Sequence, residues 1–146
     1  MRGLLRGMAQ TFKSHWRRPV TIQYPDEKEE KPPRFAGIPA LIWDAEVGEP
    51  FCTGCQVCMR NCPTDAIVVT MMDNPLAAEG QSKRRKIVEM FEIDVSRCIT
   101  CGTCVEVCNF DALEMSFSHE LASYAHREFI KDKDALLEYS RRKREG

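Results

Sequence analysis

The fold of this chain is decided by the stretch Cys52-Thr-Gly-Cys55-Gln-Val-Cys58-Met-Arg-Asn-Cys62-Pro63, which occurs twice. The second copy lies 46 positions later and reads Cys98-Ile-Thr-Cys101-Gly-Thr-Cys104-Val-Glu-Val-Cys108-Asn109. The likeness continues beyond the last cysteine, because Thr64-Asp-Ala-Ile67 corresponds to Phe110-Asp-Ala-Leu113. All eight cysteines of the protein fall in these two runs. The pattern predicts an internal repeat whose halves are related by a pseudo-two-fold axis.

The spacing of the cysteines predicts iron–sulfur clusters. The pattern C-x2-C-x2-C-x3-C is the one that bacterial ferredoxins use for [4Fe–4S] clusters. Small or polar residues between the cysteines allow the tight turns that bring three thiolates round three iron corners. The fourth cysteine cannot easily turn back to the same cube, so we expect it to reach the other cluster. The expected ligand sets are Cys52, Cys55, Cys58 and Cys108 for the first [4Fe–4S] cluster, and Cys98, Cys101, Cys104 and Cys62 for the second.

Other uses of the cysteines fit the pattern less well. A disulfide framework needs an oxidising compartment, yet the chain opens Met1-Arg-Gly3 with no apolar signal region, and cysteines so close in sequence pair poorly. Zinc ribbons use Cys-x-x-Cys pairs but have no role for a third cysteine at the same step. A zinc-stabilised interaction module therefore stays an alternative that a metal assay decides.

The composition predicts one small α+β domain. The chain has 146 residues and a formal net charge of -1. This charge, with no stacked aromatic residues, argues against a nucleic-acid partner. We expect strands at 41–43, 66–70, 87–93 and 113–117, with Ile87, Glu89, Phe91 and Ile93 on one face of the third. The predicted core spans residues 41–117, and the two clusters would stabilise it, because a domain of this size buries little apolar surface.

Two further segments flank this core. In residues 1–16 the apolar side chains Leu4, Leu5, Met8, Phe12 and Trp16 share one arc of a helix, next to an arc of arginine and lysine. Such an amphipathic helix suits a membrane surface or a groove on a partner. A charged, proline-bearing arm follows to residue 40. Residues 118–146 form a C-terminal extension that we expect to wrap the core or a partner, with Asp132 or Asp134 capping a last helix.

Two runs of basic residues are interpreted as parts of the solvent-exposed surface. Lys83-Arg-Arg-Lys86 and Arg141-Arg-Lys-Arg144 are interpreted as solvated faces, with a docking patch as the alternative for the first. We find no pattern typical of a nucleophile with its base, a phosphate loop or paired catalytic carboxylates. We expect no catalytic residue and no substrate-turnover site in this chain.

The flanking segments resemble a known family. Arg17-Arg-Pro-Val-Thr-Ile-Gln-Tyr-Pro-Asp-Glu-Lys28, Pro33-Arg-Phe-Ala-Gly37, His119-Glu-Leu-Ala-Ser-Tyr124 and Asp132-Lys-Asp-Ala-Leu-Leu137 surround the two cysteine runs. Together they look like subunit I of respiratory complex I, the proton-translocating NADH:quinone oxidoreductase. The chain departs from that family's usual pattern at Ala36, at Ile38 and Pro39, and at Asn109.

The resemblance implies a fold, a function and partners. The fold is a bacterial two-[4Fe–4S] ferredoxin-like core with an N-terminal amphipathic helix. The function is an electron relay through both clusters toward the quinone-reducing site. The expected partners are other subunits of the respiratory complex, including the quinone-site subunits and a membrane subunit, and the membrane surface through residues 1–16. The expected location is peripheral, on the cytoplasmic face of a bacterial inner membrane or the matrix or stromal face of an organelle.

Two other electron carriers share the cysteine pattern. One is the equivalent subunit of a membrane-bound hydrogenase or another relative of complex I. The other is a diffusible two-cluster ferredoxin, which predicts a free monomer. Nickel in the assembly would indicate the first, whereas FMN with NADH oxidation would indicate complex I.

Overall fold

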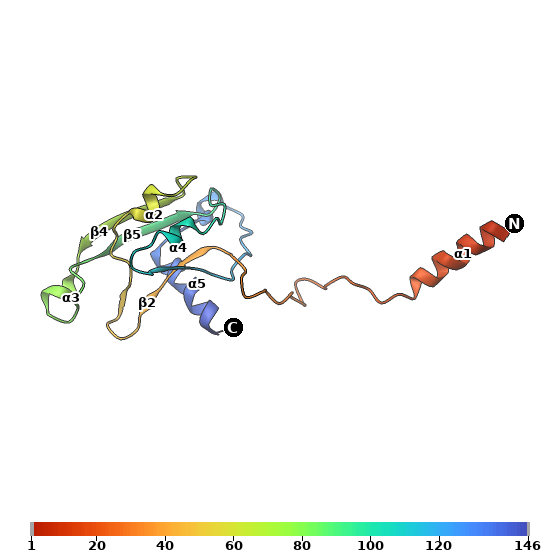
Figure 1. Cartoon of the computed structure of the whole chain (residues 1–146), viewed down its shortest axis with the longest axis horizontal. Helices are drawn as coiled ribbons and strands as arrows, with labels where there is room; N and C mark the ends of the chain where they lie inside the picture. The colour runs from red at the N-terminus through yellow and green to blue at the C-terminus, as the bar shows by residue number, and fades with distance from the viewer. Residues whose placement is uncertain (1, 146) are drawn as a thin grey trace. The chain divides into compact units, whose positions relative to one another are not determined.

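The computed structural model describes residues 2–145 and divides the chain into two units, Met1–Lys31 and Pro32–Gly146 (Figure 1). The first unit contains one helix, α1 (Arg2–His15), in which no residue is buried. Its side chains Leu4, Leu5, Met8 and Phe12 are all exposed, as is Trp16 just beyond it. The arm after α1 contains no strand over residues 20–24. Within the described residues, no helix is both long enough and apolar enough to span a bilayer.

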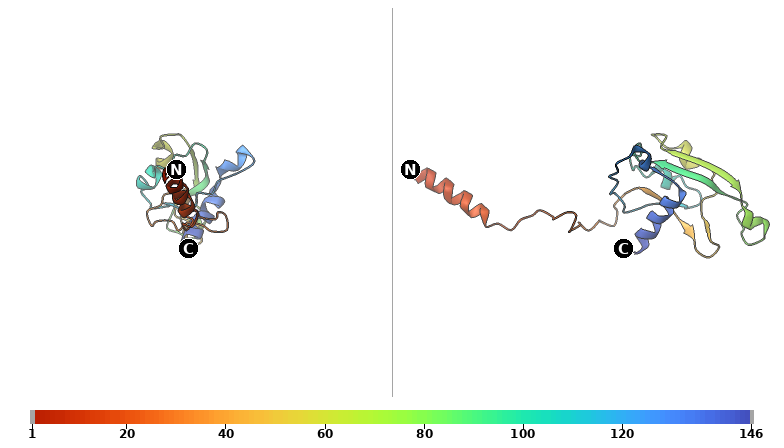
Figure 2. Two further views of the ribbon diagram at one scale, coloured as in Figure 1. Left: turned by 90° about the vertical axis from the view of Figure 1, so that its right-hand side faces the viewer. Right: turned by 180° about the vertical axis from the view of Figure 1, so that it is seen from behind.

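The second unit is built on three small antiparallel sheets. The first consists of β4 (Ile67–Asp73), β5 (Lys86–Asp94) and β7 (Ile130–Lys131), in that order. In the second, β1 (Pro39–Leu41) pairs with β6 (Leu113–Met115). In the third, β2 (Trp43–Asp44) pairs with β3 (Glu49–Pro50). Figure 2 shows β4 and β5 as a long twisted hairpin with the short helix α3 (Pro75–Ala78) at its far end.

The two cysteine runs adopt the same local structure, 46 positions apart. The short helix α2 (Val57–Arg60) corresponds to α4 (Thr103–Glu106), and the two helices are in contact. The backbone is left-handed at Gly54, Gln56 and Asp65 in the first run and at the equivalent Thr100, Gly102 and Asp111 in the second. Because residues with a side chain rarely adopt this conformation, its recurrence at three equivalent positions indicates one loop geometry built twice.

Two predictions about strands are corrected. The first strand was expected at 41–43, whereas the structure has β1 at Pro39–Leu41 and a separate β2 that starts at Trp43. The face of β5 also differs, because Val88, Phe91 and Ile93 are buried while Glu89 is exposed. The cause is a bulge: Thr70 is opposite Met90 but Met71 is opposite Val88, so the alternation of faces shifts by one residue.

The C-terminal extension covers the core. After a 3₁₀ turn (His126–Phe129) and β7, the helix α5 (Lys133–Glu145) contacts β1, β5 and β7. Of the two predicted caps, Asp132 and Asp134, the structure has Asp132, whose carboxylate accepts a hydrogen bond from the Ala135 N–H at 2.9 Å. Leu136 and Leu137 are buried by this contact. The core that results also contains Ile38, Leu41, Ile67, Val69, Val88, Phe91, Ile93 and Leu113, together with Cys52, Cys58 and Cys104.

Candidate iron–sulfur centres

The eight cysteines line two pockets, and each pocket takes cysteines from both runs. One pocket, termed here the crossed-62 pocket, is lined by Cys62, Cys98, Cys101 and Cys104. The other, termed the crossed-108 pocket, is lined by Cys52, Cys55, Cys58 and Cys108. These are the two groups of four that the spacing predicted. In each group, three cysteines come from one run and the fourth comes from the other.

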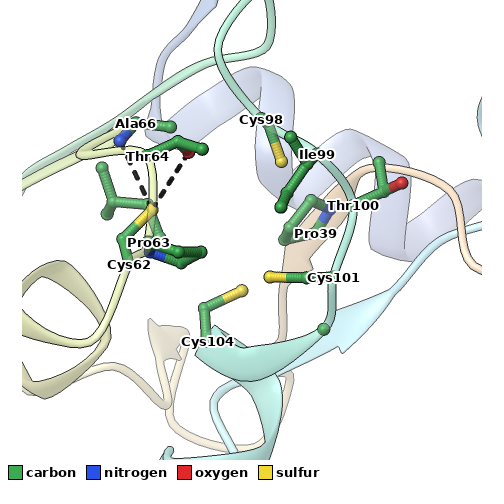
Figure 3. Close-up of a pocket in the computed structure, with 12 residues that line it drawn as sticks. Pro39, Cys62, Pro63, Thr64, Ala66, Cys98, Ile99, Thr100, Cys101 and Cys104 are labelled. Atoms are coloured by element: carbon green, nitrogen blue, oxygen red, sulfur yellow. Dashed lines mark hydrogen bonds between the residues drawn. The ribbon is translucent and has the colours of Figure 1, made fainter.

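Figure 3 shows the crossed-62 pocket with the sulfur atoms of Cys98, Cys101 and Cys104 directed toward a common space, which Cys62 borders from the opposite side. All eight cysteines are free thiols. Within residues 2–145, no three His, Cys, Asp or Glu side chains are grouped so as to hold a metal ion. Four thiols are the donor set that a [4Fe–4S] cluster uses, so the lining of each pocket fits that group.

Backbone N–H groups approach the sulfurs in equivalent places. The Ala66 N–H donates to Cys62 Sγ at 3.4 Å, and the Ala112 N–H donates to Cys108 Sγ at 3.3 Å. The Gly54 N–H donates to Cys52 Sγ at 3.4 Å. The left-handed residues allow these donors to turn inward, and hydrogen bonds to a sulfur stabilise its anionic form.

The buried thiols hold their protons strongly when no cation is near. Burial raises the pKa of Cys52 and of Cys104 to about 12, and that of Cys58 to about 11. A thiol becomes a metal ligand only as the thiolate. The buried thiols therefore need a positively charged partner to stabilise their thiolate form, and iron in a cluster would supply one.

The crossed-62 pocket is the more exposed of the two. Cys101 is the one exposed cysteine, and its hydrogen bond with Thr103, at 3.4 Å, lowers its pKa. The pKa of Cys62 is also lowered, because hydrogen bonds from Ala66 and Thr64 together outweigh the effect of burial. Burial raises the pKa of Cys98. The pocket thus opens to solvent at Cys101 and is closed at Cys104.

The two pockets lie next to each other. After burial, the largest contribution to the raised pKa of Cys104 is the charge of Cys58, a residue of the other pocket. Cys58 lies in α2 and Cys104 in α4, the two helices that are in contact. The two pockets are therefore adjacent at the contact between these helices.

Comparisons with known proteins agree with this geometry. Residues 51–112 match the family model described as a 4Fe-4S dicluster domain. The "NADH-quinone oxidoreductase subunit I 2" of Geobacter metallireducens is 40% identical over 135 residues, which cover 92% of this chain and 96% of that protein. The chain belongs to the NADH-quinone oxidoreductase subunit I family. This confirms the resemblance that the flanking segments predicted.

Other members of the subunit I family differ in length. The "NADH-quinone oxidoreductase subunit I 2" of Symbiobacterium thermophilum is 34% identical over 137 residues, or 93% of this chain, but the match spans only 55% of that protein. A solved structure of an archaeal membrane-bound sulfane sulfur reductase, described as a respiratory membrane complex, contains a similar chain. That chain is 28% identical, with a TM-score of 0.52. The match covers 88% of the present chain and 57% of the reductase chain.

One group of polar residues was missed at the sequence level. Arg84 was interpreted as part of a solvated basic run, and only its neighbours Lys83, Arg85 and Lys86 are exposed. Arg84 is half-buried and forms ion pairs with Asp44 and Glu49, which lie 40 and 35 positions earlier. No local pattern signals a contact between residues so far apart in sequence.

Proposed function

We propose that this chain is the electron-relay subunit of a membrane-bound NADH:quinone oxidoreductase, carrying electrons through two [4Fe–4S] clusters toward the quinone-reducing site. The observation that carries the proposal is the division of the eight cysteines into two adjacent pockets of four. Its membership of the subunit I family supports the assignment to that complex. The chain itself would turn over no substrate.

In this proposal the crossed-108 pocket holds one cluster on Cys52, Cys55, Cys58 and Cys108, and the crossed-62 pocket holds the other on Cys98, Cys101, Cys104 and Cys62. The donor chemistry fits, because four thiolates are the usual ligand set of a [4Fe–4S] cluster. The bound clusters would accept and release one electron at a time. The protein would fix their separation, limit access of water and supply N–H donors to the sulfurs.

The three segments of the chain would have different roles. Residues 41–117 carry the clusters, and residues 118–146 brace that core. The part of residues 1–40 that precedes Ile38 would attach the subunit to the membrane surface and to neighbouring subunits, among them the quinone-site subunits and a membrane subunit, whereas Ile38 and β1 belong to the core. The exposed apolar arc of α1, flanked by Arg2, Arg6 and Lys13, supports this attachment, because basic residues favour anionic lipid surfaces. The location would be peripheral, on the cytoplasmic face of a bacterial inner membrane.

A second assembly is favoured by one comparison. The similar chain in the archaeal sulfane sulfur reductase suggests that the same relay operates in a related respiratory complex with a different terminal reaction. Copurified subunits distinguish the two. Bound FMN together with NADH oxidation would indicate the NADH:quinone oxidoreductase. A purified complex that is active as a reductase but lacks both would indicate the related respiratory complex.

The decisive experiment is a redox titration of the anaerobically purified complex, followed by EPR, with iron and acid-labile sulfide counted in the isolated chain. We expect about eight irons per chain and two signals that appear at separate steps of potential. Zinc without labile sulfide would overturn the proposal.

A further inference from the structure

Arg84 joins two parts of the second unit that are distant in sequence. Its guanidinium donates to Asp44 Oδ2 at 2.9 Å and to Glu49 Oε1 at 2.7 Å. It also lies over the ring of Phe51, with its central carbon 4.6 Å from the ring centroid. Arg84 belongs to the connection between β4 and β5, whereas its three partners belong to the β2–β3 hairpin and the residue after it. The side chain therefore ties the connection to the hairpin.

Glu49 completes this tie from inside the protein. Glu49 is buried, with only 1% of the residue exposed. Its carboxylate accepts three hydrogen bonds, one of them the bond from Arg84 described above. Ser82 Oγ donates at 2.6 Å and Asn74 Nδ2 at 2.7 Å, in addition to Arg84. A buried carboxylate is tolerated only when it is paired and hydrogen-bonded in this way. The position of Glu49 is therefore strictly determined.

The chain passes directly from this network to the first ligand of the crossed-108 pocket. Glu49 is three residues before Cys52. Phe51, whose ring lies beneath Arg84, directly precedes Cys52. The carbonyl of Cys52 accepts a hydrogen bond from the Val88 N–H at 3.1 Å. The segment 49–52 is thus held on one side by the ionic network and on the other by β5.

The equivalent segment of the second half is held by a different and more exposed group, in which Asp94 accepts hydrogen bonds from Ser96 and pairs with Arg97 at 3.8 Å. Val95 occupies the position equivalent to Glu49, 46 residues later, and is apolar and buried. Cys98 is instead approached through a turn in which the Cys98 N–H donates to the Asp94 carbonyl at 3.1 Å. The network therefore acts on one pocket only.

We infer that Arg84 and Glu49 are positioning residues for the cluster of the crossed-108 pocket, holding Cys52 in place to bind it. The inference rests on the proposed function, because it needs clusters to be present. It gives Arg84 a structural role, whereas the basic run that contains it is interpreted from sequence as a solvated face. The other cluster should be insensitive to the network.

The test compares four variants of the full chain in its complex, one of which, Arg84→Lys, keeps a cation at that position. Arg84→Gln removes the cation. Asp44→Asn removes the charge of one of the two carboxylates that pair with Arg84 and leaves the bond between Arg84 and Glu49. This milder variant keeps the test usable if Arg84→Gln does not fold. Lys86→Gln is the matched control, because Lys86 belongs to the same run but pairs with the exposed Asp73. Iron release to a ferrous chelator is followed by EPR, with Cys52→Ser and Cys98→Ser proteins providing reference spectra for each cluster.

We expect Arg84→Gln to release iron roughly tenfold faster from the cluster of the crossed-108 pocket and to shift the midpoint potential of that cluster alone. Asp44→Asn should have a smaller effect on the same cluster, Arg84→Lys should restore part of the loss, and Lys86→Gln should match the wild type. The inference would be overturned if iron release and midpoint potential changed equally for both clusters. It would also be overturned if neither Arg84→Gln nor Asp44→Asn changed them. A wild-type chain without iron would instead overturn the proposed function.

Discussion

Cys62 and Cys104 line the same pocket, although Cys62 ends the first cysteine run and Cys104 lies in the middle of the second. Replacing Cys62 with serine should therefore damage the cluster bound by residues 98–104 and spare the cluster whose first three ligands adjoin Cys62 in sequence. Iron should fall from about eight to about four per chain. EPR of the anaerobic protein checks which signal disappears.

The matched control is Cys108→Ser, which should remove the other signal, because Cys108 lines the pocket of Cys52, Cys55 and Cys58. If the signal lost in Cys62→Ser were the one lost in Cys52→Ser, the crossed assignment would be wrong.

The apolar arc of α1 should attach the subunit to membranes. Deleting residues 1–16 should release the chain from sedimented membranes while both clusters still assemble, because α1 buries none of its residues in the chain. Replacing Leu5 and Phe12 with serine should weaken binding to anionic vesicles more than tenfold, since each buried apolar side chain contributes about 1.5–3 kcal/mol. Vesicle sedimentation measures both effects.

Gln10→Ser is the control for that arc, because Gln10 lies on the opposite side of the same helix. Unchanged sedimentation of the deletion variant would show that another part of the chain makes the attachment.

Gly37 should be intolerant of any side chain. A methyl group there would lie 2.7 Å from the Ser116 carbonyl oxygen and closer still to that of Ser118. It would also disturb the hydrogen bond from the Gly37 N–H to the Ser116 carbonyl, at 2.9 Å. Gly37→Ala should lower the free energy of unfolding by about 3 kcal/mol, measured by urea denaturation of the cluster-bound protein.

Gly7→Ala provides the comparison, because nothing lies within 4 Å of a methyl group at that position and α1 belongs to the other unit. It should leave the urea midpoint of the core unchanged. A Gly37→Ala protein as stable as Gly7→Ala would mean that the strand end near Ser116 relaxes freely.

The network around Glu49 should make stability depend on acid pH. Burial raises the pKa of Glu49, but hydrogen bonds from Ser82, Asn74 and Arg84 outweigh it, so the pKa is below its usual value of 4.5. The hydrogen bond from Arg84 is the main cause of the lowered pKa of Asp44. A carboxyl group whose pKa is lowered by folding stabilises the protein above the unfolded value, and the effect is lost as pH falls through the folded value.

The wild type should therefore exceed Glu49→Gln in urea midpoint at pH 7, and the difference should shrink below about pH 4.5. The visible absorbance of the clusters reports unfolding in both proteins, so acid damage to the clusters affects them alike. A difference that stays constant from pH 7 to pH 4 would contradict the assigned role of the carboxylate.

The repeated part of the site was predictable from sequence, because its information is local. The spacing of the cysteines and the offset between the runs were enough to predict which four would meet in each pocket. The cap at Asp132 was predictable for the same reason, since it acts on an N–H three residues later.

Features that depend on long-range contacts were not predictable. The bulge between Thr70 and Met71 moved Val88 to the buried face, although a regular alternation placed it opposite. Arg84 occupies a run of basic residues that looks uniformly solvated, yet its partners lie in a hairpin far earlier in the chain. Neither is encoded in a short window of sequence, because each depends on which strand pairs with which.

The exchange of Cys62 and Cys108 between the halves of the repeat limits how such a protein can change. If the pockets hold clusters as proposed, an isolated half would retain three sulfur donors for one cluster and a fourth that serves the other, so neither half would bind a complete cluster alone. Ancestral or engineered forms that dispense with one cluster would have to keep both halves of the polypeptide and lose only the ligands.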